Sequence, residues 1–547
     1  MNIQNIQPLN NNDRMIKSSL VLFHEKEVDE SIYSSEAQFG IYTLEIESLP
    51  MTKSEQEVLS MNDGSGSMAD ICCDRRSKMQ HLQLTLKNIV TLLSANSEKL
   101  NSRLEIIGFD DLMMEVIPKT KITNDPNQVD AIHKRIKSVL RPRGGTDIGL
   151  ALKKSQEKLQ HIPAEDLPTP TIKKSLIFMT DGIITAGIKD LESLKKLTPN
   201  NSQNYFVGLG ADHDYKLLQS LASINSGSFY YVDKIENAGL VFGEIIHSIL
   251  YTALRNVTIR VTNGEIYDFK TNQWLTEITV PNLCSESKKN YHIRSINLSI
   301  FSLTLTGLKN DNSPFVLADE IPLPPLEDPI IGELSKNNDL TKYMFRQRVL
   351  ELLHISVTIA ENELATNEEK TLHQEAMINL RKKIEAYSEK QEEQEEKDYL
   401  KQLQDDLYIS CKTLKSQNAL LYTVARQNAQ GRESSYNMTQ IEREDAMQYE
   451  DENENENYTL CKKGISRAYT TNTQMQVMRG VSEGVSEGGS EGVSEGISEG
   501  ISEGVSEGGA NIDFEEEVDE EFDTIVEKYS SNLLQRQVAW NPTTDEE

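Results

Sequence analysis

Three oxygen-bearing side chains occupy alternate positions in the segment NDGSGSM at residues 62–68. Asp63, Ser65 and Ser67 are separated by glycines and follow the apolar run EVLSMN at residues 57–62. The glycines relieve the backbone, so three short side chains can converge on one point. Carboxylate and hydroxyl oxygens are hard ligands that suit Mg²⁺ or Mn²⁺ rather than Zn²⁺. The segment therefore indicates either a metal-binding loop or a Gly/Ser-rich turn that contains an aspartate.

Two further loops carry oxygen side chains that can join the first. Thr146 lies in RGGTD, where two glycines permit a close approach of the backbone, and Asp181 lies in MTDG, directly after the apolar run KSLIFM. Each has a simpler interpretation, because Thr146 or Asp147 can cap the following helix and Asp181 with Gly182 can form a turn. The occurrence of all three loops in this order favours one shared site.

The apolar runs before these loops belong to a longer alternation across residues 54–254. Runs of strand length occupy residues 57–62, 103–109, 174–180, 204–210 and 228–232, and segments of helical period occupy 78–93, 128–140, 148–160, 188–197, 215–224 and 238–254. Strands that alternate with helices predict an α/β fold, a doubly wound and mostly parallel sheet with helices on both faces. Ligands of such sheets bind at the carboxyl ends of the strands, so we expect Asp63 and Asp181 at one edge.

These motifs together resemble the von Willebrand factor type A (VWA) domain family, whose fold is Rossmann-like. The resemblance rests on NDGSGSM, RGGTD and MTDG and covers residues 54–254, where GGTDIGLAL also fits the family. It implies that five residues form a complete metal-ion-dependent adhesion site (MIDAS): Asp63, Ser65, Ser67, Thr146 and Asp181. It further implies that this site holds Mg²⁺ (or Mn²⁺) and that an Asp or Glu of a partner protein completes the coordination shell.

Outside this domain the periodicity changes several times along the chain. Residues 1–53 form an N-terminal strand-like segment, 255–325 a small antiparallel β unit with an Asn-Gly hairpin signal, 326–427 a helical region with apolar stripes, and 428–547 an acidic low-complexity tail. Seven copies of a four-residue unit, (V/I/G)-S-E-G, occupy residues 481–508. Such a glycine-rich, polar segment cannot offset its ordering entropy, so we expect a disordered tail.

The segment after the VWA-like domain is similar to the C-terminal extension of intracellular members of that family. Some of those carry a RING zinc module, but the five scattered cysteines of this chain cannot build one. A second departure is the insert ADICCDRRSK at residues 69–78, between the metal loop and the first helix. Its adjacent Cys72 and Cys73 cannot easily share one metal, so we interpret them as thiols without a role at the site.

The composition narrows the classes of partner and the location. The formal net charge is −30, and residues 427–547 hold 28 acidic against 8 basic residues, a net charge of −20. This excess argues against nucleic acid or an anionic membrane as a partner. No apolar run reaches the ~18 residues of a membrane span, and residues 1–14 lack the apolar core of a secretion signal. We therefore expect an intracellular, cytoplasmic protein with reduced cysteines.

We predict that the protein is not an enzyme but a divalent-metal-dependent protein-binding module. No phosphate-binding loop, H-E-x-x-H or G-x-S-x-G motif occurs, and His213 lies between Asp212 and Asp214, whose charges favour its protonated form. Two alternatives stay open: a structural or assembly protein whose metal only stabilises the fold, and a metal-assisted hydrolase. A further hypothesis is an intramolecular contact, in which the acidic tail occupies the metal site and competes with outside ligands.

Overall fold

A computed structural model describes the following residues: 15–23, 38–50, 55–72, 75–160, 172–210, 213–224, 227–232, 237–295, 300–322, 340–362, 364–435 and 468–483. Within them, Met1–His24 and Ala37–Val485 belong to one compact unit. The predicted tail beyond residue 483, including most of the S-E-G repeats, lies outside the described residues. Its disorder therefore stays a prediction.

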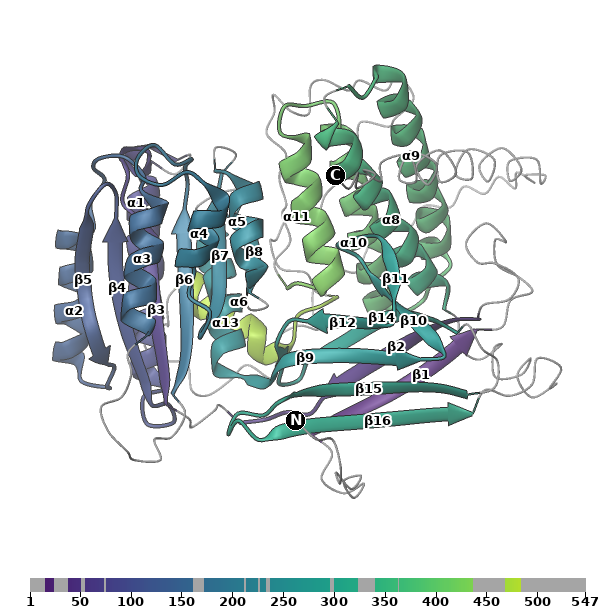
Figure 1. Ribbon diagram of the computed structural model, residues 1–547, viewed down its shortest axis with the longest axis horizontal. Coiled ribbons are helices and arrows are strands. Elements are labelled where there is room, and N and C mark those ends of the chain that lie inside the picture. Colours follow the sequence, from purple (N-terminus) through teal and green to yellow (C-terminus); the bar gives the residue numbers. More distant parts are fainter. Residues whose placement is uncertain are drawn as a thin grey trace, which may run out of the picture. The chain divides into compact units, whose positions relative to one another are not determined.

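A six-stranded sheet carries the three loops singled out from the sequence (Figure 1). Its strands, in spatial order, are β5 (Met113–Lys121), β4 (Ser102–Phe109), β3 (Gln56–Asp63), β6 (Lys173–Thr180), β7 (Gln203–Leu209) and β8 (Ser228–Val232). All pairs are parallel except β5, which runs antiparallel to β4. Every residue of β3 is buried, as expected for a central strand covered on both faces.

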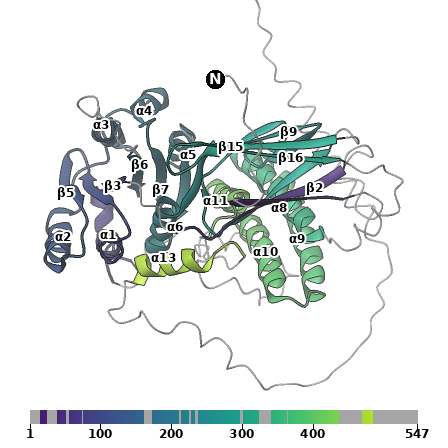
Figure 2. The same ribbon diagram turned by 90° about the horizontal axis from the view of Figure 1, so that it is seen from below.

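Helices cover both faces of this sheet (Figure 2). They are α1 (Lys78–Ala95), α2 (Pro126–Val139), α3 (Ile148–Leu159), α4 (Leu191–Leu197), α5 (Tyr215–Ala222) and α6 (Ala238–Leu250), preceded by a short 3₁₀ helix, η2 (Gly66–Ala69). One apolar core contains side chains of α1, α2 and α6, and a second core on the other face contains those of α3, α4 and α5. The predicted mixed α/β fold, with a doubly wound and mostly parallel sheet, is confirmed.

The remaining strands form two antiparallel sheets with a common apolar core. One sheet has the order β1 (Ile16–Phe23), β2 (Gln38–Ile46), β14 (Lys288–Ser295), β10 (Gly264–Asp268), β11 (Gln273–Leu275). The other has the order β12 (Glu277–Val280), β9 (Thr252–Thr262), β15 (Ile300–Leu308), β16 (Pro314–Pro322), with β13 (Leu283–Cys284) paired to β9. Strand β2 pairs with β14 along its length, so the N-terminal strands complete a sheet whose other members lie more than 200 residues further along the chain.

The region predicted to be helical contains four long helices among the described residues. They are α8 (Thr341–Glu361), α9 (Asn367–Glu389), α10 (Gln394–Thr413) and α11 (Ala419–Arg432). Helix α9 begins with a capping box between Thr366 and Glu369, a favoured N-terminal arrangement. The predicted helical character of this region is confirmed, and the division of the chain into domains stays a proposal.

A further helix, α13 (Asn472–Glu483), lies within the segment that the sequence assigns to the acidic tail. It packs on α6, where a Cβ added to Gly239 or Gly243 would come within 2.5 Å or 2.4 Å of α13 backbone atoms. Only glycine permits this approach, and it buries Met478 and Val481 completely. Composition alone hid this helix, because its apolar face is short and it runs directly into the first repeats.

None of the helices in the described part of the chain has the length and apolar character needed to cross a membrane.

Candidate metal centre

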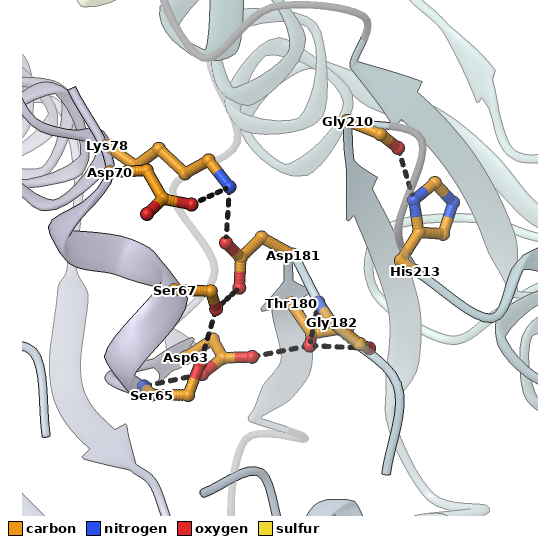
Figure 3. Close-up of polar contacts among 10 residues, drawn as sticks. All are labelled: Asp63, Ser65, Ser67, Asp70, Lys78, Thr180, Asp181, Gly182, Gly210 and His213. Atoms are coloured by element: carbon orange, nitrogen blue, oxygen red, sulfur yellow. Dashed lines mark hydrogen bonds and ion pairs between the residues drawn. The ribbon is translucent and has the colours of Figure 1, made fainter. Parts of the chain in front are cut away.

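Asp63 ends the central strand β3, and its carboxylate is fully buried. Its Oδ1 accepts a hydrogen bond from the Ser65 amide at 2.8 Å, which fixes the turn that follows the strand. Its Oδ2 accepts a hydrogen bond from the Thr180 hydroxyl at 2.5 Å, so it is tied to the end of the neighbouring strand β6 (Figure 3). The carboxylate is therefore held by both strands at the carboxyl edge of the sheet.

A chain of hydroxyl groups links this loop to Asp181 (Figure 3). The Ser65 and Ser67 Oγ atoms lie 3.0 Å apart, and the Ser67 hydroxyl donates to Asp181 Oδ1 at 2.8 Å. Asp181 directly follows β6 and is buried. The structure thus brings four of the five candidate residues, Asp63, Ser65, Ser67 and Asp181, into one hydrogen-bonded cluster.

Thr146 reaches the same edge from the loop before α3. That loop is pinned to the metal loop by backbone hydrogen bonds from Arg143 N to Gly64 O (2.7 Å) and from Gly66 N to Gly144 O (3.1 Å). The Thr146 hydroxyl lies 3.6 Å from the position a Cβ would take on Gly182, next to Asp181. No hydrogen bond joins this hydroxyl to the other four candidates in the described structure.

The alternative role of a helix cap belongs to the neighbouring residue. Asp147 is the N-cap of α3, and its side chain accepts a hydrogen bond from the Leu150 amide at 2.8 Å. The Thr146 amide instead donates to the Thr185 hydroxyl at 2.7 Å. The Thr146 side chain is therefore not needed for the helix.

The glycines of RGGTD are explained by a close approach to the loop after β4. Gly144 has a φ of +62°, and a Cβ there would meet Asp111 Oδ1 at 2.2 Å. The adjacent Asp110, fully buried, accepts from the Arg143 side chain and from the Leu112 amide. This local network fixes the loop that carries Thr146.

The electrostatics of the cluster leave the Asp63 carboxylate short of positive charge. Burial raises the pKa of Asp63 to about 6; the hydrogen bond from Thr180 opposes this shift, and the charge of Asp181 adds to it. The donors around Asp63 are a hydroxyl and an amide, which do not neutralise a buried charge. An external cation between the two carboxylates would remove this imbalance.

Lys78, which the sequence did not identify, supplies one cation to the far side of Asp181. Its Nζ lies 2.9 Å from Asp181 Oδ2 and 3.2 Å from Asp70 Oδ2. Burial alone would lower the pKa of Lys78, but the hydrogen bonds and charges of Asp181 and Asp70 outweigh it and raise the pKa. Thr180 was also missed, although its place before Asp181 at a strand end was a signal.

The protonation state of His213 differs from the sequence-based prediction. That prediction was that the acidic neighbours of His213 favour its charged form. The imidazole is 4 % exposed, and its Nδ1 lies 2.7 Å from the Gly210 carbonyl oxygen. Burial lowers its pKa to about 4 despite the attraction of Asp214 and Asp181. The side chain is neutral at physiological pH because desolvation dominates over nearby charge.

The donor chemistry restricts which metal fits the cluster. Among the described residues, no group of three or more His, Cys, Asp or Glu side chains is placed to hold a metal ion. A cation at this edge must therefore use hydroxyl oxygens together with the carboxylates of Asp63 and Asp181. An all-oxygen set with few charges fits a hard ion that keeps some of its water.

Comparisons with known proteins find similarity in the part of the chain that carries the five candidate residues. Residues 58–183 match the family model described as von Willebrand factor type A domain. One similar solved structure is the ArnB paralogue VWA2 from Sulfolobus acidocaldarius, with 15 % identity, coverage of 77 % of this chain and 99 % of that one, and a TM-score of 0.45. A second is a von Willebrand factor type A protein from Catenulispora acidiphila, with 13 % identity, coverage of 77 % of this chain and 98 % of that one, and a TM-score of 0.46. A third is proximal thread matrix protein 1 from the mussel byssus with a zinc-occupied MIDAS motif, with 20 % identity, coverage of 39 % of this chain and 51 % of that one, and a TM-score of 0.30. The match to the von Willebrand factor type A domain thus covers residues 58–183, which contain all five candidate residues.

Proposed function

We propose that this protein is a divalent-metal-dependent protein-binding module. The observation that carries the proposal is the hydrogen-bonded cluster of Asp63, Ser65, Ser67 and Asp181, which two separate loops build at one sheet edge. With Thr146 beside it, this cluster is a complete MIDAS donor set. VWA domains commonly mediate metal-dependent protein interactions, and the arrangement supports the same use here.

The donor set favours Mg²⁺, with Mn²⁺ as the alternative. Two carboxylates and three neutral hydroxyls fit the octahedral oxygen coordination of a small hard ion. A bound ion would act as a Lewis acid and would favour one more anionic oxygen as a ligand. An Asp or Glu side chain on the partner protein would supply that oxygen and would make binding depend on the metal.

The serine hydroxyls support binding rather than catalysis. Ser65 lies against Ser67, and Ser67 donates to Asp181, so these hydrogen bonds hold both hydroxyls within the set of candidate metal ligands. The imidazole of His213 is directed to the Gly210 carbonyl. We therefore propose a module without enzymatic activity. The experiment below separates this proposal from a purely structural metal, and a substrate-turnover assay with Asp63→Ala separates it from a hydrolase.

The regions after the VWA domain support a role in bringing proteins together. The antiparallel sheets and the helices α8 to α11 form an extension similar to that of intracellular VWA proteins. Cys72, Cys284 and Cys411, the cysteines that the structure describes, form no disulfide with one another, and a reducing, cytoplasmic location would keep them in this state. The acidic tail is the candidate internal ligand for the metal site.

The test combines thermal unfolding with peptide selection. Mg²⁺ at ~10 mM should stabilise the wild-type chain by about 1.4 kcal/mol if the dissociation constant is near 1 mM, and should not stabilise Asp63→Ala. Peptides selected from a displayed random library in Mg²⁺ and released by EDTA should share an Asp or Glu, and Asp63→Ala should select none. A Mg²⁺ shift without acidic peptides would support the structural alternative, and no shift in either protein would contradict the proposal.

A further inference from the structure

The insert between the metal loop and α1 ends in a lysine that contacts the candidate metal site. Lys78 Nζ is 2.9 Å from Asp181 Oδ2, on the opposite side of this carboxylate from the Ser67 hydroxyl, which binds Oδ1 (Figure 3). The Asp181 side chain is fully buried, and that of Lys78 is 20 % exposed. One of the two site carboxylates therefore already has a cation from its own chain.

The insert is folded so that it delivers this lysine. Ile71 and Ser77 form an antiparallel bridge, and the Lys78 amide donates to the Asp70 carbonyl at 2.9 Å. Asp70 Oδ2 also lies 3.2 Å from the Lys78 Nζ atom, on its solvent side. The Asp70 side chain is 64 % exposed. Backbone and side chain of Asp70 thus both orient Lys78 toward Asp181.

The position of Lys78 in its helix does not explain its presence. It is the first residue of α1, where the helix dipole disfavours a positive charge. The N-terminus is already capped by the reciprocal hydrogen bonds of Ser77 and Gln80. The compensating interaction is the ion pair with Asp181, which makes the metal site the reason for this lysine.

We propose that Lys78 is a tethered counter-ion of Asp181 that weakens divalent-cation binding at the MIDAS. This inference rests on the proposed function of the site and adds its regulation. When a cation binds, Lys78 either stays and repels it or moves away and loses its contacts with both carboxylates. Either route lowers the apparent affinity, because like charges repel and because a binding-competent state that is seldom populated binds less ligand.

A consequence is that the site fills only where the cation is abundant or where a partner carboxylate contributes. The free protein holds the metal weakly, and an acidic partner adds an anionic ligand that tightens it. Metal and partner then bind cooperatively, since each raises the affinity for the other.

The test measures Mn²⁺ binding by the full chain, using isothermal titration calorimetry and electron paramagnetic resonance of free Mn²⁺. Lys78→Gln removes the charge and keeps a good helix former; Lys78→Met serves if that variant does not fold. Lys78→Arg retains the charge. The matched control is Lys119→Gln, because Lys119 also pairs with a buried carboxylate, Glu57 at 3.0 Å.

We expect the Mn²⁺ dissociation constant to fall roughly tenfold or more in Lys78→Gln. It should stay within about threefold of wild type in Lys78→Arg and Lys119→Gln, and Asp63→Ala should abolish binding in the Lys78→Gln background as well. Wild-type binding with an unchanged or weaker constant in Lys78→Gln would overturn the inference and leave the proposed function intact. No Mn²⁺ binding by either protein would overturn both.

Discussion

Two buried aspartates, Asp63 at the sheet edge and Asp406 in helix α10, are accommodated in opposite ways. Asp406 accepts a hydrogen bond from Arg426 Nη1 at 2.9 Å and from Gln430 Nε2 at 2.6 Å. Its neighbours thus include a full positive charge that is itself buried. Asp63 has a hydroxyl and an amide as donors, and the nearby charge of Asp181 is of the same sign.

The pKa values of Asp63 and Asp406 are raised to the same extent, but the two carboxylates have different charged neighbours. Burial raises the pKa of Asp406 to about 6 against the charge of Arg426, and burial raises that of Asp63 to about 6 with Asp181 adding to the shift. The first carboxylate is balanced by its own chain. The second lacks a cation from its own chain, as the proposed metal site would require.

The largest expected effect separates these two aspartates by stability. Asp406→Ala leaves the Arg426 guanidinium buried without its carboxylate and should cost about 3–5 kcal/mol in the free energy of unfolding. Asp63→Ala in metal-free buffer removes both a buried charge and two hydrogen bonds, so its effect should stay within about 1 kcal/mol. Urea unfolding measures both. Equal losses would show that Asp63 is part of the folding framework and would remove the contrast.

His213 offers a second, smaller effect that tests whether burial dominates at this sheet edge. Its folded-state pKa is lowered to about 4, whereas the unfolded chain titrates near 6.5. Between pH 7 and 5 the unfolded state thus binds more protons, so the free energy of unfolding falls as the pH falls. We expect this residue to contribute about 2 kcal/mol to that loss.

The variant His213→Asn isolates this contribution. Asparagine can still donate to the Gly210 carbonyl but does not titrate in this range. Subtraction of the two stability curves cancels His247 and His373, whose pKa values burial also lowers to about 4. Parallel curves for wild type and variant would show that the pKa of His213 is the same in the folded and unfolded states, and a wild type that gains stability relative to the variant as the pH falls would show that its acidic neighbours favour the charged form.

These contrasts also mark how far the sequence could predict the molecule. Apolar runs identify the strands β3 and β6 because both are buried on two faces. Asp63 and Asp181 lie at the carboxyl ends of these neighbouring parallel strands and therefore share one edge of the sheet. The pairing of β2 with β14 could not be predicted in the same way. Local patterns define strands but do not say which distant strand completes a sheet.

The parts of the site that were missed depend on long-range placement. Lys78 reaches Asp181 across 103 residues only because the insert folds back on itself. The neutrality of His213 depends on burial, which flanking residues do not reveal. Motifs thus identified oxygen side chains that lie close together at this sheet edge, whereas the charges around them needed the tertiary structure.

The smallest expected effect concerns the acidic tail as an internal competitor. The truncation must begin after Val485, because α13 ends at Glu483 and Val481 is buried among α1 and α6 residues. The chain of residues 1–485 should unfold with a free energy within about 0.5 kcal/mol of the full chain if the tail is disordered as the sequence predicts, since a disordered segment contributes little to the free energy of unfolding.

Its ligand affinity should nevertheless change. A synthetic peptide of residues 486–547 should bind to the 1–485 chain in Mg²⁺, and about fivefold more weakly to the full chain, whose own tail has a high effective concentration. Fluorescence anisotropy with a labelled peptide measures both constants, with Asp63→Ala in the 1–485 chain as the control. Equal affinities would mean that the tail does not occupy the site in cis. Binding that survives Asp63→Ala would place the contact elsewhere on the protein.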